Sequence, residues 1–178
     1  MNPDPETLVL GWGNPGRGDD GLGPESVQAI EKMDLPGLAV DSDYQLQVED
    51  GAEVARYRRV VFVDADRCGV EPFRLGRLYP QDGGMSFSTH SVTPGAVLAL
   101  ARDLFKVEPE AWLLGICGYD FDEFDEQLSD RARSNMDQAV RYLQAVVLGD
   151  EWHEIPSRTA MQSTTNHHEG ELCQTINP

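Results

Sequence analysis

The 178-residue sequence is poor in cysteine and in basic residues, and it contains no long hydrophobic run. Its three cysteines are an odd number and form no C-x-x-C pair, which argues against a disulfide framework and a structural zinc site. We expect Cys68 and Cys117 to be small apolar fillers. No apolar run approaches the roughly 20 residues of a membrane span, and the segment MNPDPETLVL lacks the parts of a secretory signal. These absences predict a cytoplasmic protein without a membrane partner.

The shortage of basic residues gives a formal net charge of −17, from 14 Lys and Arg against 31 Asp and Glu. A protein that binds a phosphate backbone needs clustered Lys and Arg to displace counterions. We therefore expect no nucleic-acid partner. Hydrophobic residues make up 40% of the chain, which is typical of a globular protein, and the length suits one α/β domain.

Strand and helix patterns alternate along the first 149 residues. The expected strands are Thr7–Gly11, Ala39–Asp43, Val60–Asp64, Phe73–Tyr79 and Ala111–Cys117, and the expected helices are Pro24–Met33, Glu49–Tyr57, Thr93–Phe105 and a long last helix capped by Ser129. This alternation predicts a single three-layer α/β domain over residues 1–149, with a mostly parallel twisted sheet and helices on both faces. Residues 150–178 are polar and lack an apolar period, so we expect a flexible C-terminal tail.

A glycine-rich stretch, LVLGWGNPGRGDDGLGP at residues 8–24, follows the first expected strand. Its letters match G-x-G-x-x-G, a turn that aims backbone N–H groups and a helix N-terminus at a pyrophosphate. Here Asp19 and Asp20 would repel a phosphate, and Pro15 removes one N–H donor. No Lys-Ser/Thr follows, so a Walker loop is absent as well. Two interpretations stay open: a tight turn with solvated aspartates that cap the next helix, and a turn that presents a carboxylate for chemistry.

Further polar residues are expected at the same edge of the sheet. Asp64 closes an apolar strand, where a charged side chain is costly unless it is paired or bound. His90 is the only histidine among the first 150 residues and precedes a helix. Because ligands bind beyond the carboxyl ends of parallel strands, these two residues would meet Asp20 there. Two carboxylates and an imidazole suit a divalent metal. A loop hydrogen bond for Asp64 and a structural role for His90 are the simpler alternatives.

These motifs resemble those of the endopeptidases that mature [NiFe] hydrogenases. That family has a first strand, a G-x-G-N turn, an Asp followed by Asp or Glu, and a glycine shortly after, here GWGNPGRGDDGLG. Three more blocks occur in the family's order: VVFVDADRCG, STHSVTPGAVLALA and LLGICGYDFDEFDEQLS. The match covers roughly residues 7–148, and the tail has no counterpart.

The resemblance implies a site and a reaction. The family's metal ligands correspond to Asp20, Asp64 and His90, which would be both metal-binding and catalytic; many members carry Glu at the position of Asp20. The implied enzyme, grouped with aspartic-type endopeptidases, removes a short C-terminal extension from the precursor of a hydrogenase large subunit. No tightly bound cofactor is implied, because nickel arrives with the precursor, and zinc or cadmium would bind only adventitiously. Asp19 either supports Asp20 or is a surface residue.

Two other functions stay open at this point. A non-catalytic nickel-binding maturation chaperone would use the same three ligands without cutting the precursor. Peptidyl-tRNA hydrolases share the pattern G-x-G-N-P-G, but they continue with a basic surface and an early histidine, whereas this acidic chain continues with Arg17-Gly18-Asp19-Asp20. Cleavage of precursor, or binding of tRNA at physiological salt, separates these alternatives.

Overall fold

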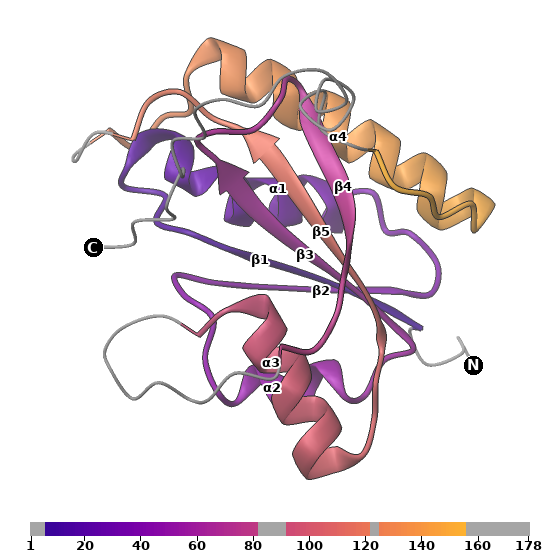
Figure 1. The fold of residues 1–178 in the computed structure, drawn as a ribbon. Coiled ribbons are helices and arrows are strands. Elements are labelled where there is room, and N and C mark those ends of the chain that lie inside the picture. Colours follow the sequence, from indigo (N-terminus) through magenta and orange to yellow (C-terminus); the bar gives the residue numbers. More distant parts are fainter. Residues whose placement is uncertain (1–5, 82–91, 122–124, 156–178) are drawn as a thin grey trace, which may run out of the picture.

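A twisted sheet with helices on both faces forms the protein (Figure 1). The computed structural model describes residues 6–81, 92–121 and 125–155. The strands are β1 (Thr7–Trp12), β2 (Leu38–Asp43), β3 (Arg59–Asp66), β4 (Phe73–Leu78) and β5 (Glu110–Cys117). Their order is β2-β1-β3-β5-β4, and every neighbouring pair is parallel except β4 with β5. The predicted α/β fold with a mostly parallel sheet is confirmed.

Two pairs of helices cover the sheet. The helices are α1 (Leu22–Glu31), α2 (Asp50–Val54), α3 (Pro94–Leu100) and α4 (Asp130–Gly149), with a 3-10 turn, η1 (Gly18–Gly21), before α1 and a π-helical turn, η2 (Ala101–Phe105), after α3. α1 and α4 contact each other over one face, and α2 and α3 contact each other over the opposite face (Figure 1). Ser129 caps α4 as predicted, because its side chain accepts from Ala132 N. Within the described ranges, no helix is long and apolar enough to cross a bilayer.

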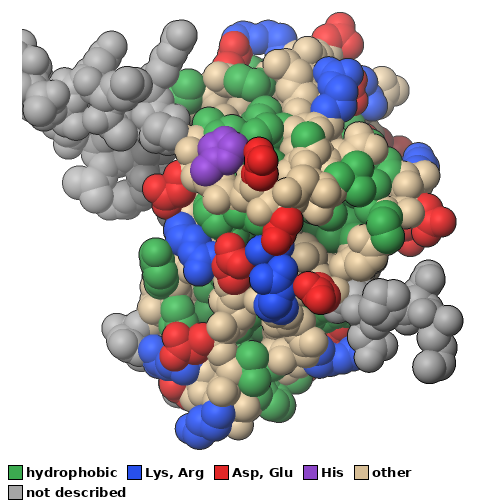
Figure 2. All heavy atoms as spheres, turned by 90° about the vertical axis from the view of Figure 1, so that its right-hand side faces the viewer, with side chains coloured by type: hydrophobic (Ala, Val, Ile, Leu, Met, Phe, Trp, Pro, Cys, Tyr) green, Lys and Arg blue, Asp and Glu red, His purple; other side chains and the backbone are tan. Residues whose placement is uncertain are grey.

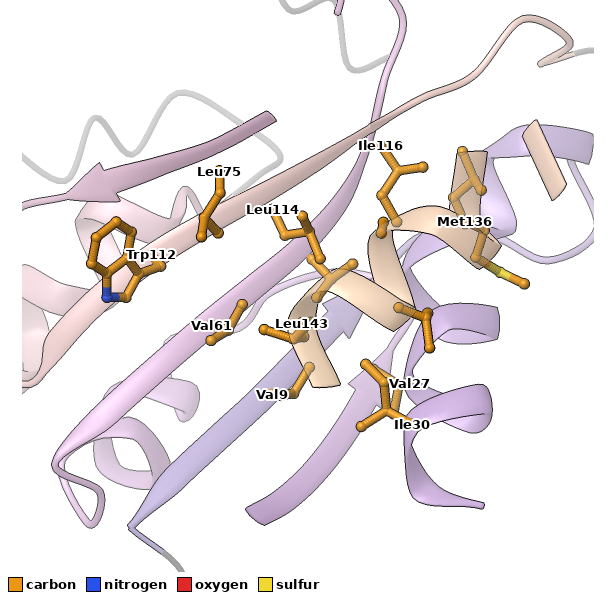
Figure 3. Packing of buried hydrophobic residues seen from close by; sticks show 14 of the residues in the cluster. Val9, Val27, Ile30, Val61, Leu75, Trp112, Leu114, Ile116, Met136 and Leu143 are labelled. Atoms are coloured by element: carbon orange, nitrogen blue, oxygen red, sulfur yellow. The ribbon is translucent and has the colours of Figure 1, made fainter. Parts of the chain in front are cut away.

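The sheet separates two hydrophobic cores. Val9 and Val61 pack with Leu143 of α4 in the core beneath α1 and α4 (Figure 3). Their neighbours along the strands point the other way, because successive side chains alternate between the faces of a sheet. They form the second core, on the face covered by α2 and α3, which contains Leu8, Leu10, Val60, Phe62, Val97 and Leu98. β3 is thus buried on both faces, as its uninterrupted apolar run predicts.

The two described cysteines differ. Cys117, at the end of β5, is buried, and its Sγ lies 3.4 Å from Gly69 O. Cys68 is exposed and disulfide-bonded. The apolar-filler prediction therefore holds for Cys117 and is wrong for Cys68, because a cysteine's spacing says nothing of its exposure.

Residues 150–155, called here the C-terminal segment, return along the outer edge of β4. Ile155 N–H donates to Leu75 O at 2.8 Å. Glu154 Oε1 accepts from Arg77 N at 3.1 Å. The first residues of the predicted flexible tail therefore pack on the sheet, since they supply partners to an edge strand. The rest of that tail lies outside the described residues, and the division at residue 149 stays a prediction.

Arg59 anchors the C-terminal segment at the amino end of the sheet. Its side chain is buried, and its guanidinium donates to Glu110 Oε2 at 2.9 and 3.1 Å and to Asp150 Oδ1 at 2.8 Å. The guanidinium also lies 4.3 Å from the ring centroid of Trp152. A buried charge requires such partners.

On the face shown in Figure 2, acidic and basic side chains are interspersed rather than separated into patches.

We predict that Trp152→Ala lowers the free energy of unfolding by about 2 kcal/mol, because it removes a half-buried ring from between Arg59 and Trp112. Leu148→Ala is the matched control, since Leu148 is 59% exposed and should change stability by no more than about 0.5 kcal/mol. Urea denaturation of both variants provides the measurement. Equal effects would show that the C-terminal segment adds no packing energy.

Candidate active site

The glycine loop, residues 11–23, turns the chain from β1 into η1 and α1. A Cβ on Gly23 would collide with the carbonyl oxygen of Trp12, and a Cβ on Gly13, whose φ is +139°, would collide with that of Asp20. Only glycine permits these close approaches. The glycines therefore bring the start of α1 and the backbone of Asp20 against the end of β1, so the loop presents a carboxylate instead of enclosing a phosphate.

β3 continues beyond the point where β1 leaves it. β1 and β3 pair only as far as Gly11 with Val63, whereas β3 pairs with β5 as far as Asp66 with Cys117. Asp64 is thus the first residue of β3 without a partner in β1. The sequence predicted that Asp64 ends the strand, but the strand runs two residues further because β5 still supports it. Asp64 nevertheless lies at the carboxyl edge of the sheet, as predicted.

Asp20 and Asp64 form a carboxylate pair at this edge. Asp20 Oδ2 accepts a hydrogen bond from Asn14 N at 2.9 Å. Asp64 Oδ1 accepts one from Ala65 N at 2.8 Å. The other oxygen of each side chain accepts no hydrogen bond from the part of the protein that the structure describes. Each member of the pair therefore keeps one oxygen for a ligand.

Burial is the main reason why the pKa of Asp64 rises from 3.8 to about 7. The negative charges of Asp20 and Asp66 also raise this pKa, against the opposing effects of the Ala65 N–H and of Arg74. The contribution of Asp20 shows that the two carboxyl groups of the pair interact. Near pH 7 the Asp64 carboxyl therefore exchanges readily between its neutral and charged forms.

Asp19 is fully buried next to this pair. Its Oδ2 accepts from Tyr119 N at 2.7 Å, Asp120 N at 2.9 Å and Ser129 Oγ at 2.8 Å, and its Oδ1 accepts from Ser129 N at 2.7 Å. Burial alone would raise the pKa of Asp19, but these hydrogen bonds hold it below its ordinary value. Asp19 is therefore no surface residue. It ties the glycine loop to the start of α4 and supports the backbone that carries Asp20.

His90, the predicted third ligand, lies outside the described residues, and its role stays a prediction. Over the ranges that the structure covers, no three or more His, Cys, Asp and Glu side chains are grouped to hold a metal. Sequence reasoning also missed Tyr119 and Ser129 as partners of Asp19. Hydrogen bonds between residues 100 and 110 positions apart leave no pattern in the sequence.

We predict that Asp19→Asn lowers the free energy of unfolding at pH 7 by about 3 kcal/mol, because an amide replaces one acceptor with a buried donor. The pKa of Asp19 is depressed in the folded state. Its stabilising contribution is therefore complete above the unfolded value of 3.8 and is lost as pH falls through the lower folded value. Urea denaturation at pH 7 and at pH 3 measures both effects. Asp137→Asn, at an exposed position of α4, is the control; equal midpoints for the two variants would contradict the prediction.

We predict the opposite sign for Asp64→Asn. Because the folded pKa of Asp64 is raised to about 7, the wild type is stabilised by the protonated carboxyl below pH 3.8 and loses that contribution as pH rises through about 7. The variant should match the wild type near pH 4 and exceed it above pH 8. We expect a gain of about 2 kcal/mol, roughly half of what the full pKa shift corresponds to, since Asp64 is half-buried. Thermal unfolding from pH 4 to pH 9 tests this; a variant less stable than the wild type at pH 8 would refute it.

Comparison with known proteins gives relatives of one kind. The chain is 29% identical over 159 residues to the hydrogenase expression/formation protein HupD of Thiocapsa roseopersicina, covering 80% of this chain and 70% of HupD. It is 28% identical over 160 residues to the putative hydrogenase maturation protease MJ0253 of Methanocaldococcus jannaschii, covering 82% and 96%. No protein-family model matches the chain.

The solved structures agree with the sequence relatives. The crystal structure of the [NiFe] hydrogenase maturation protease HycI from Thermococcus kodakarensis matches with a TM-score of 0.64 at 20% identity, over 81% of this chain and 93% of HycI. At 20% identity this match is evidence for the fold alone. Together the comparisons confirm the resemblance that the motifs predicted, and the names of the relatives agree with the predicted enzyme class.

Proposed function

We propose that this chain, which resembles the [NiFe] hydrogenase maturation proteases in sequence and in fold, is an endopeptidase that removes a short C-terminal extension from the nickel-loaded precursor of a [NiFe] hydrogenase large subunit. One observation supports this function above all. The carboxylate pair joins Asp20 of the glycine loop to Asp64 of β3, with one oxygen left for a ligand on each side chain.

Nickel belongs to the substrate in this proposal. The free oxygens of Asp20 and Asp64, together with His90, bind the nickel ion that the precursor carries. That contact places the scissile peptide bond at the carboxyl edge of the sheet. Because the pKa of Asp64 is about 7, a cation that binds its carboxylate at neutral pH displaces the proton to water with little cost. A precursor without nickel lacks this contact and is left uncut.

The aspartic-type classification depends on the same pair. A carboxyl group whose pKa lies near 7 can both donate and accept a proton at neutral pH, as peptide hydrolysis requires. Asp64 has this property only while no cation is bound to it, with Asp20 as the carboxyl that interacts with it; once it binds nickel, its proposed role is that of a charged ligand. A cytoplasmic location stays a prediction from the sequence.

We predict that Asp20→Asn and Asp64→Asn each slow processing by at least about 100-fold, because each removes an anionic ligand while nearly preserving shape. Mass spectrometry of nickel-loaded precursor follows the loss of the C-terminal peptide. Asp137→Asn, which changes an exposed aspartate of α4, should cleave at the wild-type rate. Binding of the precursor by the wild type without any cleavage would favour the chaperone alternative.

A chelator should act on the precursor and not on the enzyme. Enzyme that is treated with chelator and then dialysed should cleave nickel-loaded precursor at the normal rate, since nickel arrives with the substrate. If cleavage is lost and zinc restores it, the enzyme is an ordinary zinc peptidase and the proposed role of the carboxylate pair is wrong.

A further inference from the structure

An exposed guanidinium lies just beyond the carboxyl end of β3, the strand that carries Asp64. Arg67 directly follows β3, three residues beyond Asp64. Its Cζ lies 3.9 Å from the ring centroid of Phe121, so the guanidinium stacks on that ring. The guanidinium makes no ion pair or hydrogen bond with any residue of the ranges that the structure covers. Its N–H donors are therefore oriented by the ring and unused.

The ring of Phe121 is held next to the site. A Cβ added to Gly118 would lie 2.8 Å from Phe121 Cζ and 3.0 Å from Asp19 Cβ, so the ring and Asp19 pack against the same short stretch of backbone. Phe121 comes from the connection between β5 and α4, and Arg67 comes from the connection between β3 and β4. Arg67 is thereby fixed where these two connections meet the glycine loop.

Other arginines in this region are already engaged or enclosed, and Arg74, which acts on Asp64, forms an ion pair with Asp66 at 2.6 Å. Arg131 stacks on Tyr119, with its Cζ 4.0 Å from the ring centroid, but it forms an ion pair with Glu71. Arg17 of the glycine loop is half-buried, and its Nε is enclosed by protein. Arg67 differs from these arginines because it presents its guanidinium to solvent without a carboxylate partner in the described part of the chain.

We propose that Arg67 is a positioning residue that binds a carboxylate of the C-terminal extension of the precursor; this inference rests on the proposed function. A guanidinium matches a carboxylate with two parallel hydrogen bonds. A C-terminal extension ends in a carboxylate by definition. In a chain with a net charge of −17, that group is repelled unless a cation is provided for it. Stacking on Phe121 orders the guanidinium before the substrate arrives, so less conformational entropy is lost on binding.

The first test separates binding from chemistry. Arg67→Ala should raise KM for nickel-loaded precursor by about 10-fold while kcat stays within about 2-fold, because a contact equal in ground and transition states is lost. Arg67→Lys keeps the charge but loses the planar fork and should raise KM by about 3-fold. Arg58→Ala is the matched control, since Arg58 is also exposed but precedes β3 at the amino end of the sheet. Unchanged KM in Arg67→Ala overturns the inference.

The second test identifies the carboxylate. Precursors are prepared by ligation with an extension that is amidated at its C-terminus, or with an extension whose acidic side chains are replaced by amides. One of these two modified precursors lacks the carboxylate that Arg67 binds. That precursor should have a higher KM than the unmodified one with the wild type, but the same KM as the unmodified one with Arg67→Ala. Fully additive effects for both substrates overturn the inference.

Failure of the proposed function is distinguishable from failure of this inference. A wild type that cleaves no nickel-loaded precursor contradicts the proposed function. Calorimetry with the synthetic extension peptide then still measures Arg67: the wild type should bind the peptide about 10-fold more tightly than Arg67→Ala. Equal affinities would exclude the role of Arg67 whatever the enzyme does.

Discussion

The buried carboxylate of Asp19 is the constraint on which the arrangement of the site depends. A charge without access to water is costly unless hydrogen bonds compensate for it, and all four of its donors belong to the connection from β5 into α4. One of the donors is Ser129, which also caps α4. The glycine loop and the start of α4 therefore cannot move independently. Because Asp20 is the next residue, this contact also fixes the position of its backbone.

Two aspartates at this edge of the sheet have pKa values that are shifted in opposite directions. Asp19 is fully buried and Asp64 is half-buried, but only Asp19 receives enough N–H and O–H donors to hold its pKa below the ordinary value. Asp64 receives one backbone donor and feels the charge of Asp20, so its pKa rises. Asp19 and Asp64 are the same residue type, and the number of hydrogen-bond donors around each carboxylate decides which role it has. The anchored carboxylate stays charged, and the available one exchanges its proton near neutral pH.

The apolar runs and their periods were enough to predict a mostly parallel sheet with helices on both faces. They also predicted the edge of the sheet at which Asp20 and Asp64 lie. They act locally, and each run carries its own signal. Contacts across the chain carry none: the burial of Asp19, the support that β5 lends to the last residues of β3 and the stacking of Arg67 on Phe121 depend on residues distant in sequence. The C-terminal segment was missed for another reason, since Trp152 and Ile155 are two apolar anchors in an otherwise polar stretch.

The C-terminal segment has a consequence for how molecules of this protein meet one another. The outer edge of β4 has hydrogen-bond partners in Glu154 and Ile155, whereas the outer edge of β2 pairs with no strand in the described part of the chain. Growth of a continuous sheet through many molecules requires two free edges on each molecule. With two positions of one edge already occupied by its own chain, growth at β4 is disfavoured, and a contact between sheets is expected to end after two molecules joined edge to edge by their β2 strands.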